Sequence, residues 1–125
     1  MKIELNSLKP IYIQIAEGIE DDILNGILAE EEQAYSQYQI ARLFNVNPAT
    51  AAKGINLLVA EGILYKKRGL SMHVSIGAKE MIQEKKKKVF FSSLLRDLFL
   101  EAKKLNITKD EIKKMIDELG KEEQE

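Results

Sequence analysis

The chain has 125 residues, with 19 Lys and Arg against 20 Asp and Glu, and 45% of its residues are hydrophobic. This length predicts one domain, or one small domain with an appendage, and the apolar content excludes wholesale disorder. Because the chain has no Cys and a single His, disulfides and Cys nucleophiles are excluded and a His-based zinc site is disfavoured. No apolar run reaches the roughly 20 residues of a membrane span, and the N-terminus lacks the core of a signal peptide. We therefore expect a cytoplasmic protein with no membrane partner.

The charges are segregated along the chain. Residues 1–33 carry a net charge of −6, residues 34–79 one of +5, and residues 80–125 none. A basic segment between acidic and neutral flanks is a local electrostatic footprint, where a polyanionic partner is expected to bind. The alternative is that these charges serve solubility alone.

A first helix is predicted after Pro10, which suits the first helical position because its missing N–H is no loss there. An apolar stripe of helical period follows, made of Ile11, Ile15, Ile19 and Ile23. The polar side is made of Gln14, Glu17, Asp21 and Asp22. Gly26 is the predicted stop, and the stretch from 27 to 35 is predicted to be a connection.

Two short helices joined by a polar turn are predicted next. Ser36 and Gln39 fit a capping box at the start of the second helix. Asn47 and Pro48 fit the cap and the first position of the third helix, and Gly62 stops it. Such a pair of helices is the pattern of a helix-turn-helix.

A β-hairpin is predicted after this pair. The runs ILYKK and SMHVSI are typical of strands, because apolar and polar residues alternate in the second run. Basic residues lie near the hairpin tip. A helix-turn-helix followed by such a hairpin predicts a winged helix over residues 1–77, in a fold that is mainly α with a small β-hairpin.

Residues 78–125 are predicted to form a tail of two helices. Thr108 and Glu111 fit a capping box for the second of them, and Gly120 is its predicted end. Both helices carry apolar stripes, and the winged helix leaves no second core to cover them. We therefore expect a homodimer whose interface is made of Phe91, Leu94, Leu95, Leu98, Leu105, Ile112, Met115 and Ile116.

The start of the third helix is expected to enter a DNA major groove. The start of the second helix suits phosphates, and the basic hairpin tip suits phosphates or the minor groove. The predicted DNA-binding residues are Ser36, Gln37, Tyr38, Asn47, Pro48, Ala49, Thr50, Lys53, Lys66, Lys67, Arg68 and Gly69. The alternative is a capped structural helix and a solvated hairpin. His73 is expected to be a plain strand residue, and residues 85–88 a solvated helix face.

The stretch from Lys9 to Val74 resembles the winged-helix domain of GntR-family transcriptional regulators. The turn Asn47-Pro48-x-Thr50 and the tail ending in LNITKDEIKKMIDEL resemble the YtrA-type branch in particular. This resemblance implies a dimeric repressor, often of an operon that encodes transporters. Two basic positions of the family are occupied here by Tyr38 and Ala52, so the DNA sequence preferred elsewhere in the family is not carried over.

The sequence thus predicts a sequence-specific DNA-binding transcriptional regulator that acts as a homodimer on a pseudo-palindromic operator. The alternative is a winged helix that binds protein, which the acidic first helix and the missing arginines favour. No Gly-rich phosphate loop, nucleophile elbow or metal-ligand spacing is present. We therefore expect no enzyme, no metal and no cofactor, and leave a small-molecule effector open.

Overall fold

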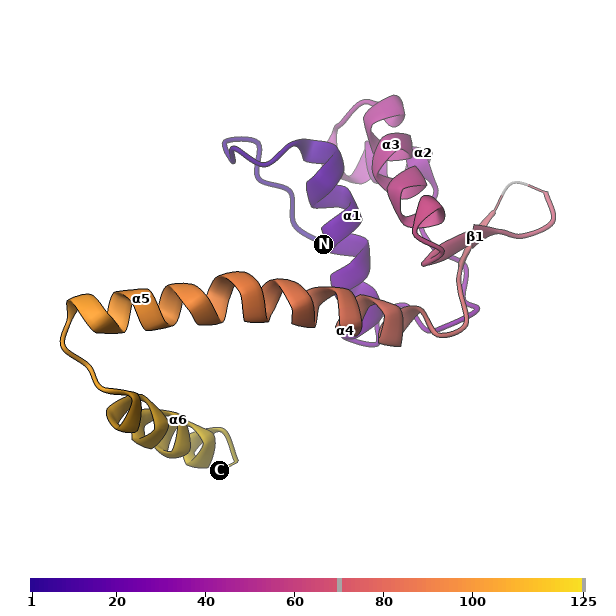
Figure 1. The fold of residues 1–125 in the computed structure, drawn as a ribbon. Coiled ribbons are helices and arrows are strands. Elements are labelled where there is room, and N and C mark those ends of the chain that lie inside the picture. The colour runs from indigo at the N-terminus through magenta and orange to yellow at the C-terminus, as the bar shows by residue number, and fades with distance from the viewer. Residues whose placement is uncertain (70, 125) are drawn as a thin grey trace. The chain divides into compact units, whose positions relative to one another are not determined.

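A computed structural model describes residues 1–69 and 71–124, and the chain divides into two compact units, Met1–Lys85 and Lys86–Glu125. Figure 1 shows the elements of the first unit in indigo to rose and those of the second in orange and yellow. The elements in chain order are α1 (Ile11–Leu24), α2 (Gln37–Phe44), α3 (Pro48–Ala60), β1 (Leu64–Lys66), β2 (Met72–Val74), α4 (Ala78–Val89), the π-helical segment η1 (Phe90–Leu95), α5 (Arg96–Lys104) and α6 (Lys109–Gln124). The predicted fold class, mainly α with a small hairpin, is confirmed.

The core of the first unit forms where α1 and α3 cross. Ile15, Ile19 and Ile23 are at most 2% exposed, so the predicted apolar stripe of α1 is confirmed. Gly54 brings α3 close to α1, because a Cβ atom at this position would lie 2.7 Å from the carbonyl oxygen of Tyr12. The distance between the two helices therefore depends on the absence of a side chain at position 54.

The predicted caps of the helix-turn-helix are confirmed. The Ser36 hydroxyl accepts a hydrogen bond from the Gln39 N–H at 3.1 Å, and the Gln39 side chain accepts one from the Ser36 N–H at 2.9 Å. The Asn47 side chain accepts a hydrogen bond from the Ala49 N–H at 2.8 Å, with Pro48 at the first helical position. Asn45 adopts a left-handed φ of 53° and ends α2. The turn between the helices is thus set by local contacts.

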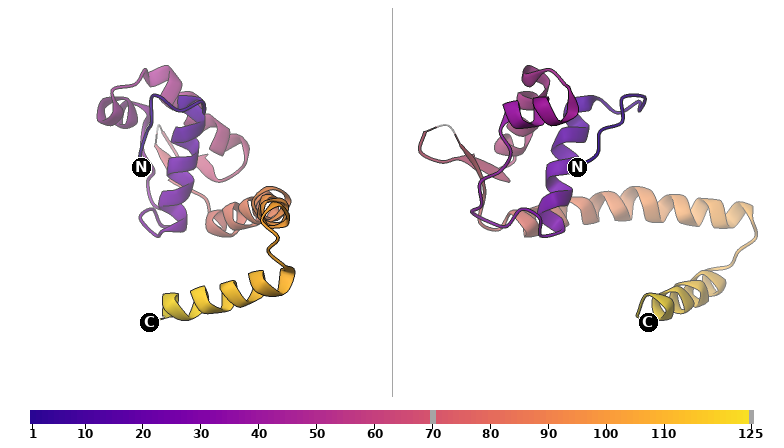
Figure 2. Two further views of the ribbon diagram at one scale, coloured as in Figure 1. Left: turned by 90° about the vertical axis from the view of Figure 1, so that its left-hand side faces the viewer. Right: turned by 180° about the vertical axis from the view of Figure 1, so that it is seen from behind.

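The hairpin pairs β1 and β2 antiparallel, with Tyr65 opposite His73. Figure 2 shows it from behind and from the side. The segment before α2 pairs with the other edge of β2, because the Ala34 N–H donates to the Met72 carbonyl at 2.8 Å and Gln33 forms a bridge with His73. The stretch predicted as a plain connection therefore helps to hold the wing.

Asp22 differs from its predicted place on the polar side of α1. It is 5% exposed and accepts a hydrogen bond from the Tyr35 hydroxyl at 2.6 Å. Burial and this contact with the Asp22 carboxylate raise the pKa of Tyr35 to about 12. The prediction was wrong because the connection before α2 folds over Asp22 and supplies a partner.

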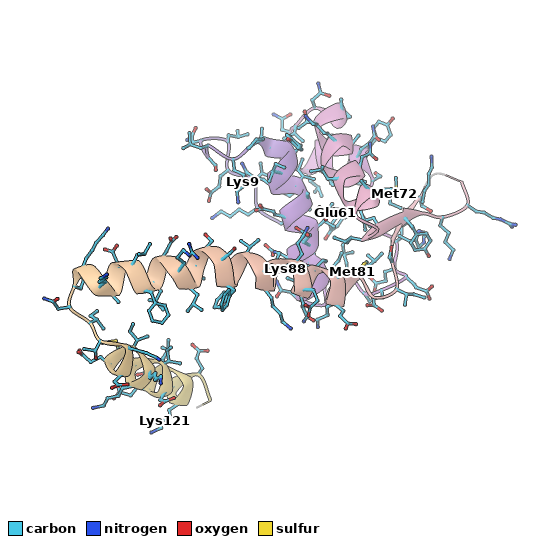
Figure 3. All side chains as sticks on the ribbon, in the orientation of Figure 1. Lys9, Glu61, Met72, Met81, Lys88 and Lys121 are labelled. Carbon is cyan, nitrogen blue, oxygen red and sulfur yellow. The ribbon has the colours of Figure 1, made fainter. Side chains whose placement is uncertain are left out.

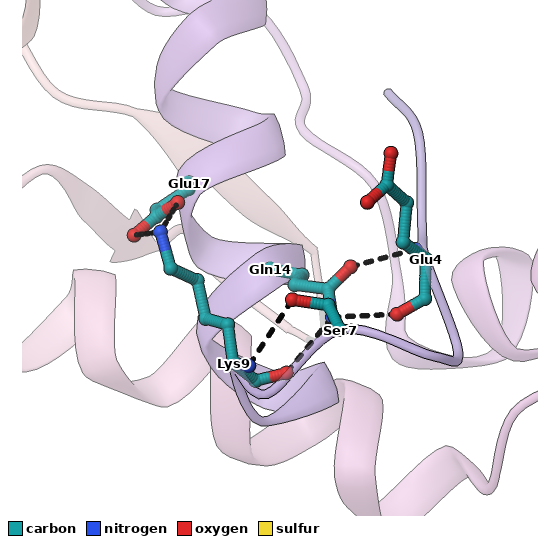
Figure 4. A network of polar contacts seen from close by, with 5 residues as sticks. All are labelled: Glu4, Ser7, Lys9, Gln14 and Glu17. Carbon is teal, nitrogen blue, oxygen red and sulfur yellow. Dashed lines mark hydrogen bonds and ion pairs between the residues drawn. The ribbon is translucent and has the colours of Figure 1, made fainter.

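Residues 1–9 fold back along α1 and are fastened by side-chain contacts (Figure 4). The Gln14 amide accepts a hydrogen bond from the Glu4 N–H at 2.7 Å and donates to the carbonyls of Glu4 and Lys9, each at 2.9 Å. The Lys9 ammonium pairs with Glu17 at 3.0 Å. One side of α1 is thus covered by this segment.

Helical structure is continuous from Ala78 to Lys104, since α4, η1 and α5 follow one another without a break. The predicted Thr108–Glu111 capping box is confirmed, with the Glu111 N–H donating to the Thr108 hydroxyl at 3.1 Å. The predicted end at Gly120 was wrong, because α6 continues to Gln124 through Lys and Glu, which favour helices.

The first unit also extends beyond the predicted division after residue 77, because Ala78 and Ile82 of α4 are buried in its core.

Candidate nucleic-acid interface

The outward face of α3 is an open stripe. Ala49, Ala52, Lys53 and Asn56 share this face because they follow the spacing i, i+3, i+4 and i+7. All but the half-buried Ala52 are exposed. These residues line an open groove of about 580 Å³ whose other walls come from Gln37, Leu57 and Ala60. The opposite face of α3 is buried in the core, so this stripe is the surface that the helix-turn-helix offers to a partner.

The other predicted residues near this stripe have different surroundings. Asn47 and Pro48 are exposed, although the Asn47 side chain is engaged as the helix cap. Thr50 is half-buried. Asn56 was not predicted, although its position three residues after Lys53 and seven after Ala49 is visible in the sequence.

Lys53 is held against α1. Its ammonium lies 4.0 Å from the centroid of the Tyr12 ring. At an exposed site such a cation–π contact contributes about 0.5–1 kcal/mol. Tyr12 was also missed by the sequence reasoning, since no local pattern pairs residues 12 and 53. To contact a phosphate, the Lys53 ammonium must either leave the Tyr12 ring or bind the phosphate while it stays in contact with the ring.

The start of α2 lies beside the α3 stripe. Gln37 is half-buried and lines the same groove as Ala49 and Lys53. Ser36 is exposed but serves as the cap, and the Tyr38 side chain is 64% exposed. The structure thus brings Gln37 of α2 to the same surface as the α3 stripe.

The hairpin tip carries unpaired cations. Lys66, Lys67 and Arg68 are exposed, and no ion pair holds them within residues 1–69 and 71–124. The Lys67 N–H donates to the Ser71 carbonyl at 3.0 Å across the turn, and Gly69 adopts a φ of 91° there. Leu70 of this tip lies outside the described residues. The tip therefore presents positive charge that is free to meet an anion.

Most of the predicted interface residues in the second unit are exposed. Phe91 is 72% exposed and Leu105 is 63% exposed; the exposed members of the set are Phe91, Leu94, Leu98, Leu105, Met115 and Ile116. Leu95 is half-buried. Ile112 is 8% exposed, so little of its surface is left for a partner. An apolar groove of about 230 Å³ lies between α5 and α6, lined by Leu98, Ala102, Leu105 and Ile112 among others.

Other expectations from the sequence concern His73 and the lysine run. His73 is half-buried beside Tyr65, with the ring centroids 6.0 Å apart. Lys85 departs from the expected solvated face, because its ammonium pairs with Glu20 and Glu61.

In the described part of the chain, no group of three or more His, Asp or Glu side chains could hold a metal ion. No helix there combines the length and apolarity needed to cross a membrane.

A helix-turn-helix with an open outer face, followed directly by a basic hairpin, defines a winged-helix DNA-binding protein. No family model matches the chain. A solved structure of a GntR-family transcriptional regulator from Bacteroides thetaiotaomicron is 33% identical, with a TM-score of 0.77 over 90% of this chain and 98% of that chain. The chain therefore belongs to the GntR family and is a DNA-binding transcriptional regulator.

Two further relatives agree with this assignment. The HTH-type transcriptional repressor YtrA of Bacillus subtilis (strain 168) is 27% identical over 120 residues, which cover 96% of this chain and 92% of YtrA. The resemblance to the YtrA-type branch is thereby confirmed. BusR of S. agalactiae, solved in complex with its busAB promoter DNA, is 26% identical, with a TM-score of 0.56 over 94% of this chain and 58% of that chain. The YtrA and Bacteroides relatives are named as transcriptional regulators, which fits the function expected from the sequence.

Proposed function

We propose that the protein is a dimeric repressor that inserts α3 into the major groove of a pseudo-palindromic operator. The observation that carries this proposal is the open α3 stripe together with the free cations of the hairpin tip in one compact unit. The word repressor rests on the likeness to YtrA, which is named a transcriptional repressor. Repression requires only that the bound protein blocks access to a promoter.

The chemistry of the stripe favours A·T base pairs. Ala49 and Ala52 offer methyl groups, which contact the thymine methyl, and Asn56 offers an amide, which matches the adenine edge in the major groove. The stripe holds no Arg for the bidentate guanine contact that is the commonest specific one. Affinity then rests on phosphate contacts from Lys53 and the hairpin tip, and sequence-dependent DNA shape adds selectivity.

The second unit supplies the dimer contact in this proposal. Most of its large apolar side chains are exposed, from 43% at Leu98 to 72% at Phe91, and exposed apolar side chains that gather on one surface mark an interaction site. A second copy of the same chain covers such a surface with an identical one about a two-fold axis. Two winged helices brought together in this way match the two halves of a palindrome.

Selection of bound fragments from a random DNA library with the full-length protein tests this proposal. We expect A·T-rich half-sites related by a dyad, with centres about 34 Å or a near multiple apart. A selected consensus built on invariant G·C pairs, with affinity unchanged in Arg68→Ala, would contradict the proposed reading of the operator. Light scattering should show a dimer, and a monomer at micromolar concentration would contradict the assignment of the tail.

A second candidate function is a winged helix that binds protein in place of a specific operator. The contact that favours it is that of the Lys53 ammonium with the Tyr12 ring. Lys53 is the one charged residue of the α3 stripe, and this contact holds its ammonium against α1. Salt dependence separates the two functions, because a protein that neutralises several phosphates loses affinity steeply as salt rises. DNA binding that is weak and equal for selected and random sequences would support the second function.

A further inference from the structure

α4 is docked on the first unit by its first two turns. Ala78 and Ile82 are fully buried in the core of that unit. Lys85 follows at the spacing i+7 from Ala78 and i+3 from Ile82, so it lies on the same face of the helix. Lys85 is also the last residue of the first compact unit. It therefore lies where the helix leaves the winged helix.

The Lys85 ammonium joins three elements. It pairs with the Glu20 carboxylate, which comes from α1, and it donates to Glu61 at 2.7 Å, just after the end of α3. Figure 3 labels Glu61 in this position and Lys88 one turn further along α4. α1, the end of α3 and α4 thus meet at one cation.

The charges of this triad depend on one another. The Glu20 side chain is 4% exposed, and a carboxylate so buried is costly unless a cation accompanies it. Burial lowers the pKa of Lys85, but the hydrogen bonds to Glu20 and Glu61 outweigh it and leave the pKa raised. The lysine accordingly stays charged, and both carboxylates draw it towards α1 and α3.

Lys85 lies within one continuous helical stretch. Helical structure continues without a break from Ala78 through η1 to Lys104. Within the first unit, Ala78 and Ile82 are the buried residues of α4, and Lys85 adds a polar contact about one turn further along the same face.

We propose that Lys85 is a positioning residue: its ion triad with Glu20 and Glu61 fixes the direction in which α4 leaves the winged helix, and thereby selects the spacing of the two operator half-sites. The proposal rests on the proposed function, because it needs a dimer that binds two half-sites at once. Avidity from two linked sites reaches a gain of about 100-fold or more only where the geometry permits simultaneous binding. A fixed helix direction concentrates this gain at one spacing, whereas a pivoting helix spreads it over several.

The test compares the full-length wild type with Lys85→Met. This substitution keeps the approximate length of the side chain and its apolar stem, and it removes the ammonium. Lys88→Met is the matched control, since Lys88 is an exposed lysine one turn further along α4. Where Lys85→Met fails to fold, the double variant Glu20→Gln with Lys85→Met removes the unpaired buried carboxylate. Circular dichroism establishes that each variant is folded.

Affinity is measured for single half-sites and for paired half-sites whose separation varies one base pair at a time. One base pair moves the second half-site by about 3.4 Å and turns it by about 35°. We expect wild type and Lys88→Met to prefer one spacing over its neighbours by about tenfold or more, a fraction of the avidity gain. Lys85→Met should bind a single half-site within about twofold of wild type, with the preference among spacings largely lost.

Three outcomes would overturn the inference. A spacing profile unchanged in folded Lys85→Met, or in the folded double variant, would show that the triad does not set the direction. A uniform loss on single and paired sites would assign Lys85 a merely structural role. A salt slope lower by about one on single sites would make Lys85 a phosphate contact. A wild type without any preference for paired sites would instead refute the proposed function itself.

Discussion

Substitution of Gly54 by Ala tests the close crossing of α1 and α3. The added Cβ atom would lie 2.7 Å from the Tyr12 carbonyl oxygen and 3.0 Å from the Ile15 Cγ2 atom. A carbonyl oxygen in a helix cannot rotate away as a side chain can. One helix must therefore shift, and the shift moves the face of α3 that carries the open stripe.

Two effects of opposite sign set the size of the change. Ala is favoured over Gly inside a helix by about 0.8–1 kcal/mol. Overpacking of a filled core costs about 1–3 kcal/mol, and contact with backbone places this site near the upper end. We expect the free energy of unfolding to fall by about 1–2 kcal/mol, the cost of overpacking less the gain in helix propensity. Because the first unit has 85 residues, each kcal/mol corresponds to roughly 4–8 °C in melting temperature.

Thermal and urea denaturation, followed by circular dichroism, measure this change. Gly120→Ala is the matched control, because Gly120 also lies inside a helix and a Cβ atom there meets nothing within 4 Å. This control should stabilise α6 by about 0.5–1 kcal/mol through propensity alone. If Gly54→Ala raised the melting temperature as the control does, the close crossing of α1 and α3 would be refuted.

Four further substitutions test other contacts of the structure. Because the pKa of Tyr35 rises from 10.0 to about 12 on folding, the stability that this group contributes is present below pH 10 and is lost as pH rises to about 12. Urea denaturation across this range should show a smaller loss in Tyr35→Phe, because this variant forms no phenolate beside the Asp22 carboxylate. Lys53→Ala should weaken binding to all DNA sequences and lower the salt slope by about one. Asn56→Ala should cost about 1–3 kcal/mol on the selected site only, and fluorescence anisotropy on selected and random DNA compares the two. Leu98→Glu places a charge in the apolar face of the second unit and should give a monomer in sedimentation, whereas a persisting dimer would move the interface elsewhere.

The features that the sequence predicts correctly are local. The capping boxes at Ser36 and Thr108 each join residues three positions apart, and Asn47 caps a helix whose first residue is Pro48. A contact of this kind is specified by the neighbouring residues themselves, so the fold around it adds little. The period of four in α1 is equally local, and its burial followed from the apolar character of the stripe.

The features that the sequence missed join distant residues. Asp22 meets Tyr35 across 13 positions, and Lys85 meets Glu61 across 24. Each of these charged residues looks solvated in its own segment, because its partner lies in another element that packing brings near. The same reason explains Lys53, whose place on the Tyr12 ring depends on the crossing of α1 and α3. The sequence thus predicted which residues lie on the surface of a helix. It did not predict which of these side chains are engaged by a residue of another element.

These tertiary contacts also bear on the choice between DNA and protein as partner. The net charge of −6 over residues 1–33 was the sequence argument for a protein-binding module. In the structure Glu20 and Asp22 are buried with partners inside the unit, and Glu17 pairs with Lys9. Glu17 and Glu20 of α1 are thus paired with lysines of the same unit, whereas the cations of the hairpin tip have no ion-pair partner among the described residues. The hairpin tip thus offers exposed positive charge in the same unit as the α3 stripe, and a DNA backbone is the partner whose charge it matches.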